Sequence, residues 1–258
     1  MTRGTLTNTQ RSEFQRDGFL KLPALIGVEQ VDLLKRRIEQ FVSGDLTPGI
    51  LRQTELASGE TEPRAGGKTE RDPVRKFQHV AASDDLFSAH MNSEAVRNVL
   101  SSILGASFLV YSDIIFMKPA QVGSRQPYHQ DRVLGYHIDA QAPMAGLWFA
   151  LDAATEANGC LRFIPGSHKA RMTLEQAQEI EDKAISAGIE NEMVVEAEPG
   201  DAILIDSLVL HASEPNRSDV HRWVYSCFCV SCDALFTGPN EDKPDFLVLQ
   251  GTRKPGRI

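Results

Sequence analysis

The hydrophobic pattern of this chain begins with helical spacing across its first hundred residues. In 28–42, apolar residues recur every three or four positions, which predicts an amphipathic helix with one buried face. The segment 94–104 has the same period. A shorter helix is predicted over 7–17, where a Thr or Asn can cap the first turn, and 18–22 is predicted to form the first strand.

Strand signals dominate the rest of the chain. Runs rich in branched and aromatic residues, separated by turn signals, predict strands at 108–118, 144–152, 161–164, 193–197, 202–205 and 223–230. Between them, 173–187 has the pattern of a charged helix, which we expect to be peripheral. Repeated strands with intervening turns predict a mainly β fold, a double-sheet barrel or jelly roll with flanking helices.

One long segment, 46–72, follows neither period. It contains Gly66 and Gly67 together with two prolines and several charged residues, and we expect it to be a mobile loop. Two interpretations remain open at this stage. The loop is either a solvated surface insertion or a lid that orders over bound substrate, since loops often have such roles.

The length of the chain predicts one large domain. Its 258 residues are enough for a substantial core, and single β-rich domains often reach this size. We therefore expect a single domain over 1–258. Its N-terminal part, about 1–105, would be helical, and its β core would occupy about 106–232.

Composition and charge restrict the classes of partner. Hydrophobic residues make up 41% of the chain and charged residues 24%, which are ordinary globular values. The formal net charge of −8 argues against nucleic acid, whose recognition normally needs a basic surface. No apolar run is long enough to cross a bilayer, and no N-terminal signal pattern is evident. We expect a soluble, cytoplasmic protein with no membrane partner, and the sequence predicts no oligomeric state.

The cysteines allow two interpretations. Cys227, Cys229 and Cys232 lie close together, and the first two alternate with apolar residues in a strand pattern. Small buried side chains in a core strand are favoured, because free cysteine is usually buried. A structural zinc site normally needs four ligands at matched spacings, and no second pair with such a spacing occurs. Disulfides are not expected in a reducing compartment.

Candidate chemistry centres on a His-x-Asp pair. His129 and Asp131 are two positions apart, so on a strand their side chains would leave the same face and reach one ion. A third ligand, His211, would have to arrive from another strand. Two imidazoles and one carboxylate on a divalent metal form the ligand set of non-haem iron(II) oxygenases, with the opposite positions left for cosubstrate and oxygen.

The surroundings of these residues make the pattern specific. The chain carries Asn-Gly-Cys-Leu-Arg-Phe-Ile-Pro-Gly-Ser-His over 158–168, Pro-Gly-Asp over 199–201, an apolar run into His-Ala-Ser at 211–213, and Asn-Arg-Ser at 216–218. From about 74 to 232 this order and spacing resemble the phytanoyl-CoA dioxygenase family of Fe(II)/2-oxoglutarate-dependent oxygenases. The resemblance implies a double-stranded β-helix, a cupin-like jelly roll, with the metal at one open end. It also implies Fe(II) as cofactor, with 2-oxoglutarate and O2 as cosubstrates.

The resemblance further implies roles for four residues around the cosubstrate. Arg222 stands eleven positions after His211, where the family places a basic residue on the far carboxylate of 2-oxoglutarate. A guanidinium suits that task because it grips a carboxylate through two parallel hydrogen bonds. Ser213 matches the hydroxyl partner of the same carboxylate. Trp148 and Lys76 match further positions around the cosubstrate.

The implied reaction is hydroxylation of a small or mid-sized organic molecule, with release of succinate and carbon dioxide. Alternatives with the same cofactors are desaturation, epimerisation or ring rearrangement of a natural-product intermediate, and hydroxylation of a fatty acyl-CoA. For a CoA thioester, Arg125, Arg132 and Lys169 could contribute to phosphate binding. Related enzymes that halogenate lack the metal-binding carboxylate, so Asp131 argues against chlorination.

Two classes outside the family remain open. A zinc hydrolase could use the same three ligands to activate water, but Arg222 would have no role in it. A sensor protein with an inactive barrel would be expected to lack a ligand or the cosubstrate arginine, and neither is missing here.

The other histidines are weaker candidates. We expect a structural role for His168 in its Pro-Gly-Ser-His turn, while His137 lies near the predicted mouth and could touch substrate. His221 has no partner at ligand spacing. His79 either lies near Lys76 in the site or caps a packed turn.

Overall fold

The structure is a computed structural model that describes residues 4–46, 51–54, 74–134, 137–238, 247–252 and 257. The helices are α1 (Asn8–Asp17), α2 (Val28–Ser43), α3 (Asp85–Met91), α4 (Glu94–Leu104) and α5 (Leu174–Ala187). The strands are β1 (Phe19–Leu22), β2 (Leu51–Thr54), β3 (Val74–Gln78), β4 (Phe108–Lys118), β5 (Gln126–His129), β6 (Met144–Ala150), β7 (Leu161–Phe163), β8 (Met193–Val195), β9 (Ala202–Asp206), β10 (His211–Ser213), β11 (Arg222–Ser231) and β12 (Leu247–Gln250).

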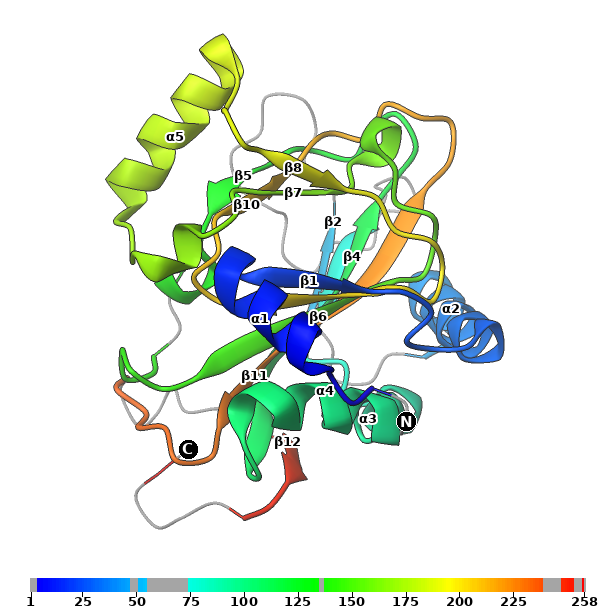
Figure 1. The fold of residues 1–258 in the computed structure, drawn as a ribbon. Coiled ribbons are helices and arrows are strands. Elements are labelled where there is room, and N and C mark those ends of the chain that lie inside the picture. Colours follow the sequence, from blue (N-terminus) through cyan, green and yellow to red (C-terminus); the bar gives the residue numbers. More distant parts are fainter. Residues whose placement is uncertain are drawn as a thin grey trace.

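Two antiparallel sheets form the centre of the molecule. The large sheet has the order β1-β9-β6-β11-β4-β3-β2, with β12 also paired to β4, and the small sheet has the order β5-β10-β7-β8. In Figure 1 the small sheet lies above the large one, and the two face each other. This arrangement is a double-stranded β-helix, as the family resemblance implies, and it agrees with the double-sheet fold that the strand pattern predicts.

Three helices cover the outer face of the large sheet. Residues of α2, α3 and α4 share one apolar cluster with the outward side chains of β4, β6 and β11. A second cluster lies between the two sheets. The alternation along β11 explains this division, because Tyr225 and Cys227 face the helices while Val224 faces the small sheet.

Helix α5 covers the outer face of the small sheet. Its Ala177 and Ile180 pack with Tyr128 on β5 and with Leu210 and Ala212 around β10. In Figure 1 α5 projects beside β5, away from the other helices. The helix is therefore positioned directly behind the strands that carry the candidate metal ligands.

Local sequence signals explain several element boundaries. Thr7 and Gln10 form a reciprocal capping box at the start of α1, and Gly18 ends this helix in the left-handed conformation that glycine tolerates best. Thr173 and Gln176 form the same kind of box at the start of α5. These contacts satisfy backbone groups that a helix end leaves without partners.

Most predicted elements are confirmed, and the exceptions have physical explanations. The helices expected over 7–17, 28–42, 94–104 and 173–187 form, as do all six strands predicted from 108 onward. Helix α3 was not predicted, because its seven residues are too few for a clear period. The structure starts it at an Asp84 cap that accepts hydrogen bonds from the Leu86 and Phe87 amides. Strand β12 was also missed.

Strand β1 confirms the strand predicted over 18–22. Strands β2 and β3, which come from the part of the chain expected to be helical, join the same large sheet. The expectation that 46–72 lacks regular structure is wrong at Leu51–Thr54, which pairs with β3 as β2. Pairing with a neighbouring strand stabilises β2, and a local pattern does not reveal it. The rest of the predicted loop, and with it the lid hypothesis, lies largely outside the described residues.

The core interpretation of the cysteines is confirmed, since Cys160, Cys227, Cys229 and Cys232 are all buried and free. Within the described helices, none is both long and apolar enough to pass through a bilayer.

Candidate active site

The two candidate histidine ligands lie opposite each other on neighbouring strands. Strand β10 pairs antiparallel with β5, and His211 stands directly across from His129. Opposite residues in a sheet project to the same side, so both imidazoles point into the space between the sheets. Their ring centroids are 4.3 Å apart.

Asp131 completes the cluster from just beyond the end of β5. The expectation that it shares a strand with His129 is wrong, because β5 ends at His129 and Asp131 begins a short 3-10 turn over Asp131–Val133. Gln130 between them is still extended, with φ −106° and ψ 122°, so both side chains leave the same side of the chain. The strand ends before Asp131, but the side chains of His129 and Asp131 still lie on the same face, as predicted.

The ligand atoms of the three side chains converge. His129 Nε2 lies 3.6 Å from Asp131 Oδ1, and His211 Nε2 lies 3.5 Å from Asp131 Oδ2. All three ligand atoms lie within 4.8 Å of one another. Donor atoms that each sit about 2.1 Å from one ion are roughly 3.0–3.6 Å apart at ordinary ligand angles, so the cluster has the size of a metal site.

Backbone contacts fix which ring nitrogen faces this point. His129 Nδ1 lies 2.7 Å from the Pro127 carbonyl, and His211 Nδ1 lies 3.0 Å from the Val209 carbonyl. A carbonyl accepts only from a protonated nitrogen, so Nδ1 carries the proton and Nε2 presents its lone pair to the cluster.

The electrostatics of the cluster favour a cation. Burial lowers the pKa of His211 to about 4, so its imidazole is neutral at physiological pH, which is the metal-binding form. Burial also acts to lower the pKa of His129, but its contact with Asp131 outweighs this and raises it. Asp131 Oδ2 is buried and accepts no hydrogen bond from the described residues. An orphaned buried carboxylate oxygen is costly, and a divalent metal at this point would satisfy it.

Two polar side chains hold the segments that carry these ligands. The fully buried Gln130 donates to the Ala170 and Leu208 carbonyls and accepts from the Met172 amide. Ser167, of the Pro-Gly-Ser-His turn, accepts from the amide of Leu210, the residue before His211. The positions of the ligands therefore depend on contacts from segments distant in sequence.

The cluster lies in a cavity of about 420 Å³ between the sheets. Its lining includes all seven residues that the sequence assigns to metal and cosubstrate: Lys76, His129, Asp131, Trp148, His211, Ser213 and Arg222. They come from five strands and one turn spread over residues 76–222, yet they surround one space.

Arg222 is buried in this cavity, and no acidic side chain among the described residues forms an ion pair with it. It is 2% exposed, its Nη1 donates to the Gly159 carbonyl at 2.8 Å, and its guanidinium lies 5.6 Å from the centre of the Trp148 ring. Burial lowers its pKa to about 10, which still leaves it charged at neutral pH. Its Nε has no hydrogen-bond acceptor, and it forms no ion pair, within the described parts of the chain. A buried unpaired guanidinium is suited to an anionic ligand.

The resemblance motifs have identifiable tasks around Arg222. Gly159 has φ +85°, and a Cβ there would lie 2.2 Å from the Glu214 carbonyl oxygen, so only glycine can present its own carbonyl to Arg222. Asn216 is 1% exposed and donates to the Lys118 and Val220 carbonyls, which fixes the turn leading into β11.

Lys76 and Arg75 both reach the cavity because β3 is irregular. In the pairing of β2 with β3, Gln53 stands opposite Lys76 but Thr54 stands opposite Val74, so Arg75 is an extra residue in β3. A β-bulge of this kind redirects side chains. Burial lowers the pKa of Lys76, with a further contribution from the charge of Arg75.

Several residues that line the cavity were not predicted from the sequence. Arg75, Gln126 and Tyr111 line the cavity, as do Ser112, Ser226 and Phe228. Period-2 alternation on β4 and β11 could have identified some of them, since Ile114 and Phe116 alternate with residues that face the helices. Arg75 follows from the bulge, and no sequence signal indicates it. His79 also lines the cavity, at the exposed rim.

The other candidates take structural positions. Arg125 pairs with Glu181 and Glu214, and the buried Arg132 donates to two backbone carbonyls, so neither contributes to an open patch for CoA phosphates. The His168 ring contacts the Gln15 carbonyl, as the structural interpretation predicts. His137 packs on Phe236 outside the cavity lining, and His221 lies on Trp223.

The fold and site define the class of this protein as a cupin-like double-stranded β-helix with a His-Asp-His cluster between its sheets. Its sequence matches the phytanoyl-CoA dioxygenase (PhyH) family over residues 14–224. A phytanoyl-CoA dioxygenase domain-containing protein 1 of Bos taurus is 30% identical over 275 residues, covering 91% of this chain and 94% of the bovine protein.

Solved structures share the fold at low sequence identity. The α-ketoglutarate-dependent carbocyclase SnoK from nogalamycin biosynthesis has a TM-score of 0.74 at 17% identity, covering 97% of this chain and 99% of SnoK. EctD from S. alaskensis, with 2-oxoglutarate and 5-hydroxyectoine, has a TM-score of 0.74 at 19% identity, covering 100% of this chain and 88% of EctD. The chain belongs to the phytanoyl-CoA dioxygenase family, whose members are Fe(II)/2-oxoglutarate-dependent oxygenases.

Proposed function

We propose that this protein is a non-haem Fe(II)/2-oxoglutarate-dependent dioxygenase that hydroxylates a small or mid-sized organic molecule, with release of succinate and carbon dioxide. The observation that carries the proposal is the convergence of His129, Asp131 and His211 in one cavity with the buried Arg222, which forms no ion pair with any described residue. A zinc hydrolase would need the same ligands but not this arginine. A sensor that had lost its activity would not be expected to keep both the three metal ligands and Arg222.

Each residue has a chemical task under this proposal. His129 and His211 would hold iron(II) through Nε2, and Asp131 through its carboxylate. The bound iron would supply activation of O2, coupled to oxidative decarboxylation of 2-oxoglutarate, so that an unactivated C–H bond can be oxidised. The protein binds and orients the substrate and excludes water.

The far carboxylate of 2-oxoglutarate would lie against Arg222. The Arg222 Nε, which has no acceptor among the described residues, would donate to it together with the Ser213 hydroxyl. Trp148 stacks behind the guanidinium and limits its movement. Lys76 would add positive charge from β3, which belongs to the same sheet as Arg222.

The cavity supports a substrate of limited size. Its volume of about 420 Å³ falls within the range of small-molecule sites, roughly 300–1,000 Å³. Its lining combines hydroxyl, aromatic and aliphatic groups. The internal contacts of Arg125 and Arg132 make a fatty acyl-CoA the weaker alternative.

The deciding experiment has two stages. Protein loaded anaerobically with iron(II) should develop a weak visible charge-transfer band when 2-oxoglutarate is added. A succinate-release screen with product mass measurement should then identify the substrate. A gain of one oxygen indicates hydroxylation, loss of two hydrogens desaturation, and unchanged mass epimerisation or rearrangement. Absence of the band in fully metal-loaded protein would reject the proposed function.

A further inference from the structure

The strand that carries His129 is poorly supported by its own sheet. Strand β5 has four residues and lies at the edge of the small sheet, where β10 is its single neighbour among the described strands. Pro127 has no backbone N–H to give to the ladder. The pairing also slips, because His211 stands opposite His129 whereas Ser213 stands opposite Gln126. An edge strand with a proline and a register shift needs other contacts to hold a ligand in place.

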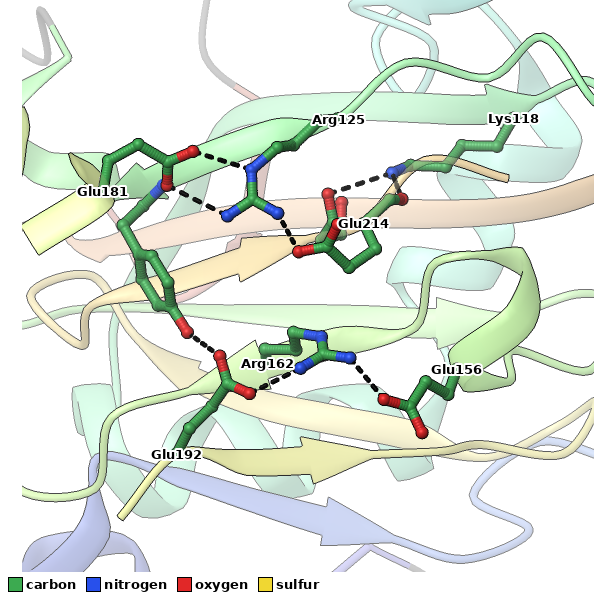
Figure 2. A network of polar contacts seen from close by, with 9 residues as sticks. Lys118, Arg125, Glu156, Arg162, Glu181, Glu192 and Glu214 are labelled. Carbon is green, nitrogen blue, oxygen red and sulfur yellow. Dashed lines mark hydrogen bonds and ion pairs between the residues drawn. The ribbon is translucent and has the colours of Figure 1, made fainter. Parts of the chain in front are cut away.

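Glu181 of helix α5 supplies such contacts. Its carboxylate accepts from the Tyr128 backbone N–H at 3.0 Å, immediately before His129. It also receives two hydrogen bonds from Arg125, from Nε at 2.7 Å and from a terminal nitrogen at 3.1 Å. Figure 2 shows this fork, with the guanidinium and the carboxylate in parallel contact. Glu181 is only 4% exposed, although it lies on a helix with a mostly charged surface.

Arg125 extends the contact to the second ligand strand. Its Nη1 forms an ion pair with Glu214, the residue after Ser213 at the end of β10. The Glu214 carbonyl in turn accepts from Lys118 Nζ, at the end of β4 in the large sheet. In Figure 2 one guanidinium bridges Glu181 and Glu214. The strand that carries His129 and the strand that carries His211 are thus linked at the point where their pairing shifts register.

We propose that Glu181 is a positioning residue for the metal ligand His129, and that through Arg125 it sets the spacing of β5 and β10 and hence the affinity of the site for its divalent metal. This inference rests on the proposed function in taking the His129, Asp131 and His211 cluster as a metal site. Glu181 does not touch the cluster and acts through Tyr128 and Arg125. Groups that orient metal ligands typically change metal affinity roughly 10- to 100-fold when they are replaced.

A purely structural role for Glu181 makes a different prediction. Helix α5 also docks through the apolar contacts of Ala177 and Ile180, so loss of Glu181 could merely loosen the helix. Asp84 provides a matched control. It too is a buried carboxylate that pairs with an arginine, Arg37, and accepts backbone N–H groups, but it lies among the helices and does not line the cavity.

The test measures binding of cobalt(II) alone to the full chain, by calorimetry and by its visible spectrum, in wild type, E181Q, E181D and D84N. We expect E181Q to bind cobalt(II) at least about 10-fold more weakly, with a changed spectrum. E181D keeps the negative charge on a side chain that is one methylene shorter, so it should recover part of the cobalt(II) affinity. D84N should lower unfolding stability and leave affinity and spectrum close to those of wild type.

The outcomes separate this inference from the proposed function. Wild-type affinity and spectrum in E181Q would overturn the positioning role while leaving the metal site intact. A wild-type protein that binds no cobalt(II) would reject the metal site and the positioning role with it. Should E181Q not fold, E214Q would decide, because Glu214 is 25% exposed at the other end of the same guanidinium. E214Q should weaken cobalt(II) binding several-fold, and unchanged binding would count against the inference.

Discussion

The two sheets present their functional residues from very different surroundings. The large sheet has long strands, with 11 residues in β4 and 10 in β11, and three helices bury its outer face in an apolar cluster. The small sheet has strands of three or four residues and is joined to α5 and its loops by ion pairs. The candidate metal ligands come from the small sheet and its turn. Arg222, Trp148 and Lys76 come from the large sheet.

This division indicates that metal binding and cosubstrate binding can be disturbed separately. An apolar layer fixes Arg222, Trp148 and Lys76, three of the four groups expected to hold 2-oxoglutarate, whereas directional polar contacts hold the ligand strands and with them the fourth group, Ser213. Apolar packing tolerates no change of volume without a loss of stability, and hydrogen-bonded charges depend strongly on geometry. The following changes test the separation.

The largest effect is expected at the small sheet, from Asp131→Ala. Removal of the one carboxylate in the cluster should lower metal affinity and succinate formation by more than ~100-fold, because changes outside the ligand set alone cost roughly 10–100-fold. Calorimetry and a succinate assay measure the two losses. Asp219→Ala, at an exposed position, is the control. Full activity of the Asp131 variant would refute its assignment as a ligand.

On the large sheet, Arg222→Ala should act on the cosubstrate. A carboxylate that loses a buried charged partner loses about 2–4 kcal/mol, so the KM for 2-oxoglutarate should rise roughly 30- to 1,000-fold. The KM of Arg222→Lys should lie between those of wild type and Arg222→Ala, because an ammonium keeps the charge but cannot form two parallel hydrogen bonds. Cobalt(II) affinity should stay within a few-fold of wild type. An unchanged KM would remove the assigned role of Arg222, and a parallel loss of metal would show that the sheets are coupled.

Behind the large sheet, Phe87→Ala should affect stability alone. Phe87 is fully buried between Phe41 and Tyr225, and such a truncation costs about 3–5 kcal/mol of unfolding free energy. Urea unfolding measures the loss, with Leu33→Ala on the exposed side of α2 as control. Metal affinity of the folded variant should not change. A large loss of affinity would mean that the helix layer also positions the ligands.

The smallest effect concerns the thiols in protein without metal. Burial raises the pKa of Cys160 to about 11, so near pH 8 this thiol is protonated and unreactive until the structure opens. Cys160 precedes β7 in the small sheet, whereas Cys227 and Cys229 lie on β11 against the helix layer. We expect Cys160 to be labelled several-fold faster, as judged by mass spectrometry of the labelled peptides. Equal rates would contradict a weaker small sheet.

Some of these features could be predicted from the sequence, because they depend on local periodicity or on fixed spacing. The helix over 28–42 and the strand over 108–118 follow from the positions of their apolar residues, and both form as expected. The motif order indicated the family, and the resemblance indicated seven of the residues that line the cavity. Strand β2 and helix α3 were missed, because a four-residue pairing and a seven-residue helix give little periodic signal.

The chain itself determined the residue types of the site, the fold class and the faces of its longer elements, because these depend on neighbours within a few positions. Only the tertiary structure decided the register that sets His211 opposite His129 and the bulge that turns Arg75 inward. It also decided the hydrogen bond from the Tyr128 amide to Glu181. Each of those joins segments dozens of residues apart. Their geometry depends on how the sheets and helices pack together, and local sequence carries no record of that packing.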